Sequence, residues 1–340
     1  MRTACAAAHH GRMNDIASAA FAPVSLPAQD VFPPPTISRQ AQEALSVGAQ
    51  TPRAQRPDPE DLDGWRRAVA ESNAMWDEMA GQMLAGCRAS IETQELAGVT
   101  CYLATPPGQR ADDERVYLYI HGGAFVFGGG AFAKAFGGLT AERLGIRTVS
   151  VDYRMPPDHP FPAAPEDCVA VYRELLKTCD PARIIIGGSS AGGNLAAAST
   201  LMIRDRGLPL PAAVILLTPE VDLTEAGDTF CTNALLDVVL KGPLPECNGV
   251  YAAGHDLTDP YLSPVFADFS KGYPPTLVQS GTRDLFLSNS VLIHRRLRDA
   301  GIDAELHVWE GMPHGGFGFG DTPENAEINA ELRRFIARYL

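Results

Sequence analysis

The sequence has no uninterrupted apolar run close to the ~18–20 residues that a transmembrane helix requires. Basic residues are also few, because 28 lysines and arginines stand against 41 aspartates and glutamates, which gives a formal net charge of -13. A chain this acidic is repelled by the phosphates of nucleic acids and by anionic lipid surfaces. We therefore predict no nucleic-acid partner and no stable membrane anchoring.

The seven cysteines are odd in number, and no two of them are spaced as Cys-x-x-Cys. This pattern argues against a disulfide framework or a zinc site and favours reduced thiols. The first ten residues carry one arginine but no continuing apolar core, so they are not typical of a signal peptide. We predict a cytoplasmic protein without a bound metal ion, whose N-terminus is a disordered tail.

Strand and helix patterns alternate along most of the 340 residues, of which 45% are hydrophobic. This alternation predicts one large α/β domain with a mostly parallel sheet and helices on both faces. Residues 222–258 interrupt the alternation, and residues 1–55 read as a lead-in with at most a short helix over 38–45. Strands are predicted at 92–106 (one or two), 116–120, 148–153, 184–186, 213–217, 276–280 and 305–309. Helices are predicted at 58–87, 131–144, 165–177, 191–206, 288–300 and 323–339.

One motif stands between a short β-branched strand and a helix-forming run: Gly188-Ser189-Ser190-Ala191-Gly192. In this context G-x-S-x-G predicts a nucleophile elbow, a sharp turn that exposes a serine at a helix N-terminus. Gly188 and Gly192 fit because a Cβ at either position would collide with the strand or the helix. Ser190 is the predicted nucleophile, because it has a glycine two residues away on both sides.

In a parallel sheet, functional loops follow the carboxyl ends of the strands. Asp284 follows the strand at 276–280, and His314 follows the last strand. The order Ser190, Asp284, His314 is that of the α/β-hydrolase triad. We therefore predict Asp284 as the acid and His314 as the base.

Other residues compete for these two roles. Glu220 and Asp222 follow the strand at 213–217, where some hydrolases place the acid, and Asp284 could instead be a helix cap. The latter would leave His314 without an orienting partner, so Asp284 is preferred. His307 lies within a strand and His294 within a helix beside two arginines, and both are interpreted as structural or solvated.

A second motif, His121-Gly122-Gly123-Ala124, follows the strand at 116–120. Acyl transfer needs hydrogen-bond donors that already point at the developing oxyanion, and the backbone of small residues can approach closely enough. Gly123, Ala124 and the residue after the nucleophile, Ala191, are the predicted donors, with Gly122 as a further candidate. His121 is predicted to brace this loop rather than to act as the base.

With these motifs the chain, over roughly residues 90–340, resembles the microbial hormone-sensitive-lipase-like esterases of the α/β-hydrolase superfamily. The resemblance extends to four further stretches: Tyr153-Arg154, 157–164, 259–264 and Met312-Pro313-His314. It implies carboxylester hydrolysis of short- to medium-chain acyl esters, without a cofactor, through a Ser-His-Asp triad and an acyl-enzyme. The small-molecule ester would be the only partner besides a possible second copy in a homodimer.

The resemblance also implies a helical cap on the catalytic domain. Residues 56–90 would form cap helices, 1–55 would contribute to the cap, and 222–258 would be a cap insertion. The catalytic domain would then comprise 91–221 and 259–340.

This chain departs from the family pattern at four places: Ala124 for a third glycine, Ser189 before the nucleophile, one extra residue between His314 and Phe317, and Pro219-Glu220 where an aromatic residue is frequent. These departures affect the expected substrate pocket more than the expected chemistry. Two alternatives remain open: an amide, carbamate or lactone hydrolase on the same triad, and a non-catalytic small-ligand receptor.

Overall fold

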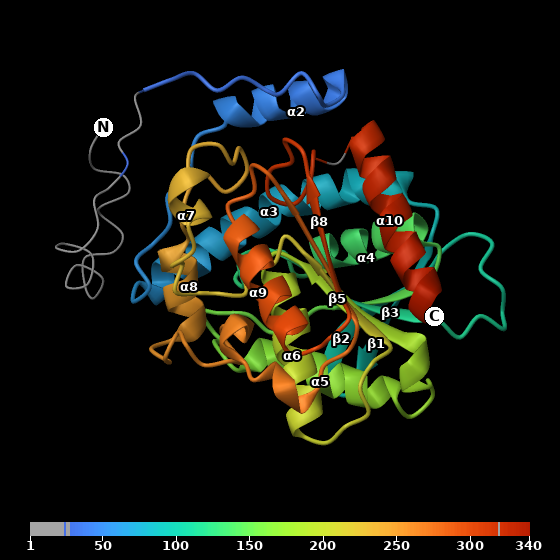
Figure 1. Ribbon diagram of the computed structural model, residues 1–340. Helices are drawn as coiled ribbons and strands as arrows, with labels where there is room; N and C mark the ends of the chain where they lie inside the picture. The colour runs from blue at the N-terminus through green and yellow to red at the C-terminus, as the bar shows by residue number, and fades with distance from the viewer. Residues whose placement is uncertain (1–23, 25–27, 319) are drawn as a thin grey trace.

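A single eight-stranded sheet runs through the molecule (Figure 1). The computed structural model describes Val24 and residues 28–318 and 320–340, so most of the predicted N-terminal tail lies outside the described residues. The strands are β1 (Ser90–Leu96), β2 (Val99–Thr105), β3 (Val116–Ile120), β4 (Arg147–Val151), β5 (Ile184–Ser189), β6 (Ala213–Leu217), β7 (Thr276–Gly281) and β8 (Ala304–Trp309).

The strand order is β1-β2-β4-β3-β5-β6-β7-β8. β1 and β2 form an antiparallel hairpin, and β2 also pairs antiparallel with β4. All the other pairs, from β4 to β8, are parallel, so their carboxyl ends meet at one edge. The prediction of a mostly parallel sheet is therefore confirmed.

Helices cover both faces of the sheet. The helices are α2 (Arg39–Gln50), α3 (Leu62–Gly86), α4 (Ala131–Leu144), α5 (Ala163–Leu175), α6 (Ala191–Asp205), α7 (Thr229–Thr232), α8 (Pro245–Ala252), α9 (Leu287–Asp299) and α10 (Pro323–Tyr339). Alternate side chains of β3 show the two layers. Leu118 and Ile120 belong to the core shared with α5, α6 and α9, whereas Tyr117 and Tyr119 belong to the core shared with α4 and α10.

A third apolar cluster lies beside the loops that follow β3 and β7. It joins Trp65 of α3 and Phe230 of α7 to three residues at α8, and it includes Leu285 and Phe286 from the turn after β7. The indole of Trp65 lies 6.2 Å from the Phe127 ring, just beyond β3. The irregular segment 222–258 and the long helix α3 thus meet over the carboxyl ends of the strands.

Helix α2 lies apart from that cluster. Its Ala41 and Leu45 pack in the same core as residues of α10, and Ser38, its N-cap, bonds to Glu324 through both its N–H and its hydroxyl. The helix continues to Gln50, beyond the short helix expected over 38–45. This N-terminal segment is therefore tied to the far end of the chain.

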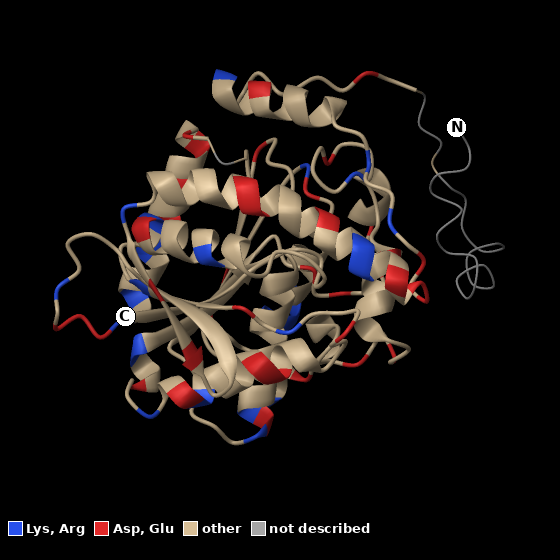
Figure 2. Ribbon diagram, turned by 180° about the vertical axis from the view of Figure 1, so that it is seen from behind, with Lys and Arg blue, Asp and Glu red and all other residues tan. Residues whose placement is uncertain are grey.

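Acidic and basic residues are interspersed over the helices seen from behind (Figure 2). Within the described ranges, no helix has both the length and the apolar character needed to cross a membrane.

Candidate active site

Ser190 stands between β5 and α6 in a strained conformation, with φ 60° and ψ -124°. Its N–H donates to the carbonyl of Leu217 at the end of β6, which fixes the turn. A Cβ on Gly192 would lie 2.1 Å from the Ile120 carbonyl oxygen, and one on Gly188 would lie 2.4 Å from the oxygen of Gly192. Only glycine fits at these two positions, so the motif has the geometry of a nucleophile elbow.

His314 lies between Ser190 and Asp284. Its Nε2 is 2.8 Å from the Ser190 hydroxyl, and its Nδ1 is 3.0 Å from Asp284 Oδ1. Because a carboxylate only accepts, Nδ1 carries the proton and Nε2 is left to accept from the serine hydroxyl. The structure thus brings the three predicted residues together from the turns after β5, β7 and β8.

Asp284 is fully buried and its oxygens have three donors. Oδ1 accepts from the Phe286 N–H as well as from His314, and Oδ2 accepts from the hydroxyl of Ser280 at 2.6 Å. Burial lowers the pKa of His314, but the hydrogen bond and charge of Asp284, together with the charge of Asp237, outweigh burial and raise it. The site therefore favours the protonated imidazole that forms when a base takes up a proton.

The loop 121–125 lies directly against the elbow. A Cβ on Gly122 would be 2.8 Å from the Ser189 carbonyl oxygen and 3.3 Å from Ser190 Cβ. Gly123 and Ala124 have positive φ angles of 127° and 50°, which turn the backbone sharply at this point. Ala191 occupies the first position of α6, directly after Ser190.

His121 is buried and stacks on Tyr153, with ring centroids 4.2 Å apart. Its Nδ1 donates to the Gly122 carbonyl at 2.8 Å, and the Tyr153 hydroxyl donates to the His121 carbonyl. These bonds hold the loop in place, as a bracing residue would. Burial lowers the pKa of His121, so the ring is kept neutral.

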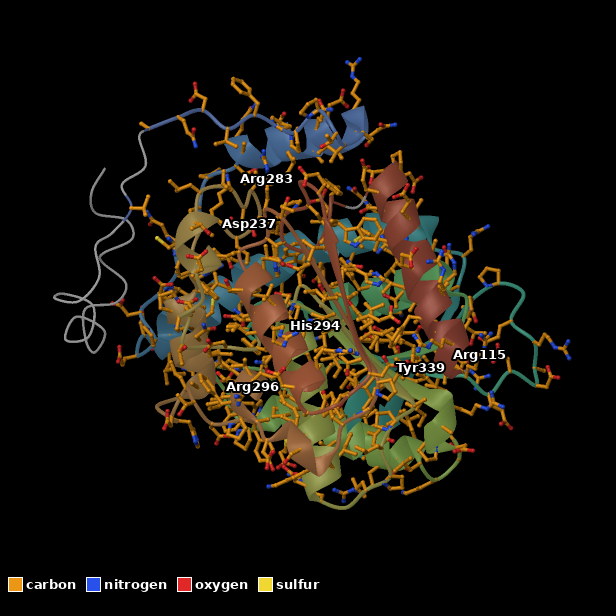
Figure 3. All side chains as sticks on the ribbon, in the orientation of Figure 1. Arg115, Asp237, Arg283, His294, Arg296 and Tyr339 are labelled. Carbon is orange, nitrogen blue, oxygen red and sulfur yellow. The ribbon has the colours of Figure 1, made fainter. Side chains whose placement is uncertain are left out.

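The competing residues lie elsewhere. Asp222 accepts from the N–H and hydroxyl of Thr224, and Glu220 accepts from the side chain of Asn248. His307 contacts Glu305 on its own strand, and His294 lies within α9 (Figure 3). None of these side-chain contacts reaches His314 or Ser190; only the backbone N–H of Glu220, among these four residues, approaches the Ser190 carbonyl, at 3.4 Å.

Asp237, in the segment after α7, was not predicted from the sequence (Figure 3). Its carboxylate is buried and lies close to Asp284 and His314, with one ligand atom from each residue within 4.8 Å of the others. Its neighbours in the sequence, Leu-Leu-Asp-Val-Val, form no recognisable motif. Such a compact set could in principle hold a cation, but both imidazole nitrogens of His314 are already used by Ser190 and Asp284.

Comparison with known proteins gives the family. The model of the α/β-hydrolase fold family matches residues 117–318. The chain belongs to the α/β-hydrolase family. An acetyl-hydrolase from Streptomyces hygroscopicus is 34% identical to this α/β-hydrolase over 204 residues, which are 59% of this chain and 68% of the relative.

Solved structures refine the position of this α/β-hydrolase within the family. Esterase E25 superposes with a TM-score of 0.86 at 33% identity, over 94% of this chain and 99% of that one. An esterase from the bacterial hormone-sensitive lipase family gives a TM-score of 0.73 at 32% identity, over 89% and 98%. The predicted membership of the hormone-sensitive-lipase-like esterases is confirmed.

Proposed function

We propose that this α/β-hydrolase is a serine carboxylesterase that cleaves short- to medium-chain acyl esters through an acyl-enzyme. The observation that carries the proposal is the position of the His314 imidazole, within hydrogen-bonding distance of both the Ser190 hydroxyl and the Asp284 carboxylate. A serine, a base and an acid in this order form the unit that activates a hydroxyl for attack on a carbonyl.

In the proposed mechanism, Ser190 Oγ attacks the ester carbonyl while His314 Nε2 takes the serine proton. Asp284 holds the imidazole in the Nδ1–H tautomer and stabilises its positive charge. The N–H groups of Gly123, Ala124 and Ala191, with Gly122 beside them, donate to the oxyanion. His314 then protonates the leaving alcohol. Water, activated by the same imidazole, releases the acid and restores Ser190.

The surroundings support an apolar acyl group. Phe286 packs edge-on against His314 with ring centroids 4.8 Å apart, and it belongs to the apolar cluster with Trp65 and Phe230. Ala124, at the predicted oxyanion site, packs against the same cluster. An acyl chain leaving the carbonyl carbon on this side would meet aliphatic and aromatic side chains.

The test replaces Ser190 by alanine and measures turnover of a short p-nitrophenyl ester. We expect Ser190→Ala to lose roughly 10⁴–10⁶-fold in kcat, because the nucleophile is absent. Ser189→Ala is the matched control, since this neighbouring hydroxyl has no part in the proposed chemistry and should change kcat only a few-fold. Unchanged turnover in Ser190→Ala with an intact circular dichroism spectrum would refute the proposal.

A series of esters of increasing acyl length tests the expected chain-length preference. An amide, a carbamate and a lactone in the same series test which type of bond is cleaved. The proposed esterase hydrolyses the short and medium esters fastest; faster cleavage of one of the other substrates would reassign it. A homodimer and a cytoplasmic location stay predictions from the sequence and the family resemblance.

A further inference from the structure

Asp237 joins three loops at the active site. Its Oδ2 accepts from the N–H of Leu285 at 2.8 Å, and the N–H of His314 approaches the same oxygen at 3.3 Å. Its Oδ1 accepts from Val239 at 2.9 Å and from Leu240 at 3.2 Å, within its own turn. One carboxylate thus connects segment 222–258 to the residue after Asp284 and to His314 itself.

Four backbone N–H groups that converge on one side chain require an acceptor on both of its branches. A carboxylate meets this requirement, whereas an amide would turn an NH₂ group toward one pair of donors. Unmade bonds at a buried site cost free energy, so the geometry selects for aspartate at this position. The same geometry places a second negative charge beside the His314 imidazole.

We propose that Asp237 is a positioning residue of the esterase reaction, a second carboxylate that fixes His314 through its main chain and stabilises the imidazolium by its charge. The inference rests on the proposed function, because it assigns His314 as the general base. Asp284, in the turn after β7, bonds to Nδ1 of the imidazole. Asp237, in the segment after α7, acts on His314 through its backbone N–H and through its charge.

Within the described part of the chain, the following charged or titratable groups act on Asp237 and His314. Three groups face His314: Asp284 from the turn after β7, Asp237 from the segment after α7, and the Ser190 hydroxyl from the turn between β5 and α6. Asp237 is faced by His314 and Asp284. Burial raises the pKa of Asp237 and Asp284 adds to this rise, whereas His314 and the N–H donors oppose it.

A neighbouring residue offers a matched control without charge. Asn233 donates from its side chain to the carbonyls of Asp284 and Thr282, at 2.9 and 3.2 Å. It therefore holds the turn that contains Asp284 and belongs to the same segment as Asp237. Its replacement disturbs the geometry of the acid turn but leaves the number of negative charges around His314 unchanged.

The experiment measures kcat and KM for a short p-nitrophenyl ester between pH 5 and 9. For Asp237→Asn we expect kcat to fall roughly 10–10²-fold with little change in KM, because the imidazole is less well placed. Loss of the negative charge should also lower the pKa of His314 and move the acidic limb of kcat/KM to lower pH by roughly 0.5–1 unit. Asn233→Ala should lower kcat without moving that limb.

An NMR titration of the His314 imidazole in the same proteins separates this inference from the proposed function. A lowered imidazole pKa in Asp237→Asn supports the role of Asp237. This holds even if Ser190→Ala stays active and so refutes Ser190 as the nucleophile. An acidic limb and an imidazole pKa that do not move, with kcat lowered as in Asn233→Ala, would show a merely structural role. Asp237→Ser is a second neutral variant, and failure of both variants to fold would likewise overturn the proposal.

Discussion

Two groups of buried carboxyl groups lie near the carboxyl ends of the strands, and their surroundings differ. Asp284 bonds to the imidazole of His314, Asp237 accepts from its backbone N–H, and both carboxylates accept from further N–H groups. Glu220 and Glu225 share the side-chain amide of Asn248, Glu225 also accepts from the N–H of Leu244, and one Glu220 oxygen, Oε2, has no hydrogen-bond partner among the described residues. The first group therefore has a basic side chain in direct hydrogen-bond contact, whereas arginine charges act on the second group without an ion pair to either glutamate among the described residues.

The difference appears in the pKa values of the second group. Burial raises the pKa of Glu220 well above its usual value, and the nearby charge of Glu225 raises it further. Burial raises the pKa of Glu225 to about 7, although the N–H of Leu244 opposes the rise. Burial raises the pKa of Asp237 as well, but there the charge of His314 and the N–H donors oppose the rise, so the donors and basic partners of a buried carboxyl group decide how far its pKa rises.

Exchange of one carboxylate for an amide should have its largest effect on activity in the first group. We expect Asp284→Asn to lower kcat by roughly 10⁴-fold, because His314 then loses the acceptor that sets its tautomer. Asp222→Asn is the matched variant, since Asp222 follows β6 and its charge acts on Glu220 and Glu225. It should keep kcat within a few-fold in the same p-nitrophenyl ester assay. Loss of activity in Asp222→Asn alone would assign the role of the acid to Asp222.

The second group should affect stability rather than activity, and its effect depends on pH. A carboxyl group whose folded pKa is raised contributes stability that is complete below the unfolded value, near 4.5, and is lost as pH rises through about 7. The shift of Glu225 corresponds to about 3 kcal/mol, as an upper bound. We expect Glu225→Gln to remove this part of the pH dependence and to be more stable than the wild type at pH 8.

Urea unfolding at pH 4.5, 6 and 8 measures this effect. Glu78→Gln, at an exposed position of α3, controls for the change in net charge and should leave the slope of stability against pH as in the wild type. The same slope in Glu225→Gln and in the wild type would show that the pKa of Glu225 is not raised in the folded protein.

The two groups also show what could be predicted from the sequence. The alternation of elements and the motifs around Ser190 and His121 are local signals, and the structure brings Ser190, Asp284 and His314 together as their positions after strands suggested. Asp237 had no such signal. Its partners Leu285 and His314 are 48 and 77 positions away, and only the folding of segment 222–258 brings them together.

Glu220 illustrates the opposite difficulty. Its position after β6 made it a candidate acid, and nothing in its neighbours predicts complete burial. Its partner Asn248 comes from α8, on a segment whose sequence shows no strand pattern and no long amphipathic helix. The path of such a segment depends on packing against α3 and the turn after β7, which are distant in sequence.

The smallest effect is expected at Arg56, a cation whose charge acts on Glu220. Arg56 is half-buried, and its positive charge lowers the pKa of Glu220 and of Cys247. No ion pair joins it to either glutamate among the described residues, so it should contribute only about as much as an exposed pair.

We therefore expect Arg56→Gln to change the free energy of unfolding at pH 8 by less than about 1 kcal/mol, with Arg56→Lys as the charge-preserving control. Burial raises the pKa of Glu220 and so disfavours its charged form, which is the physical reason for so small an effect. A loss of more than about 2 kcal/mol in Arg56→Gln, absent from Arg56→Lys, would mean that Glu220 is ionised and paired with Arg56. Both groups would then hold charged carboxylates against a cation, and the contrast between them would disappear.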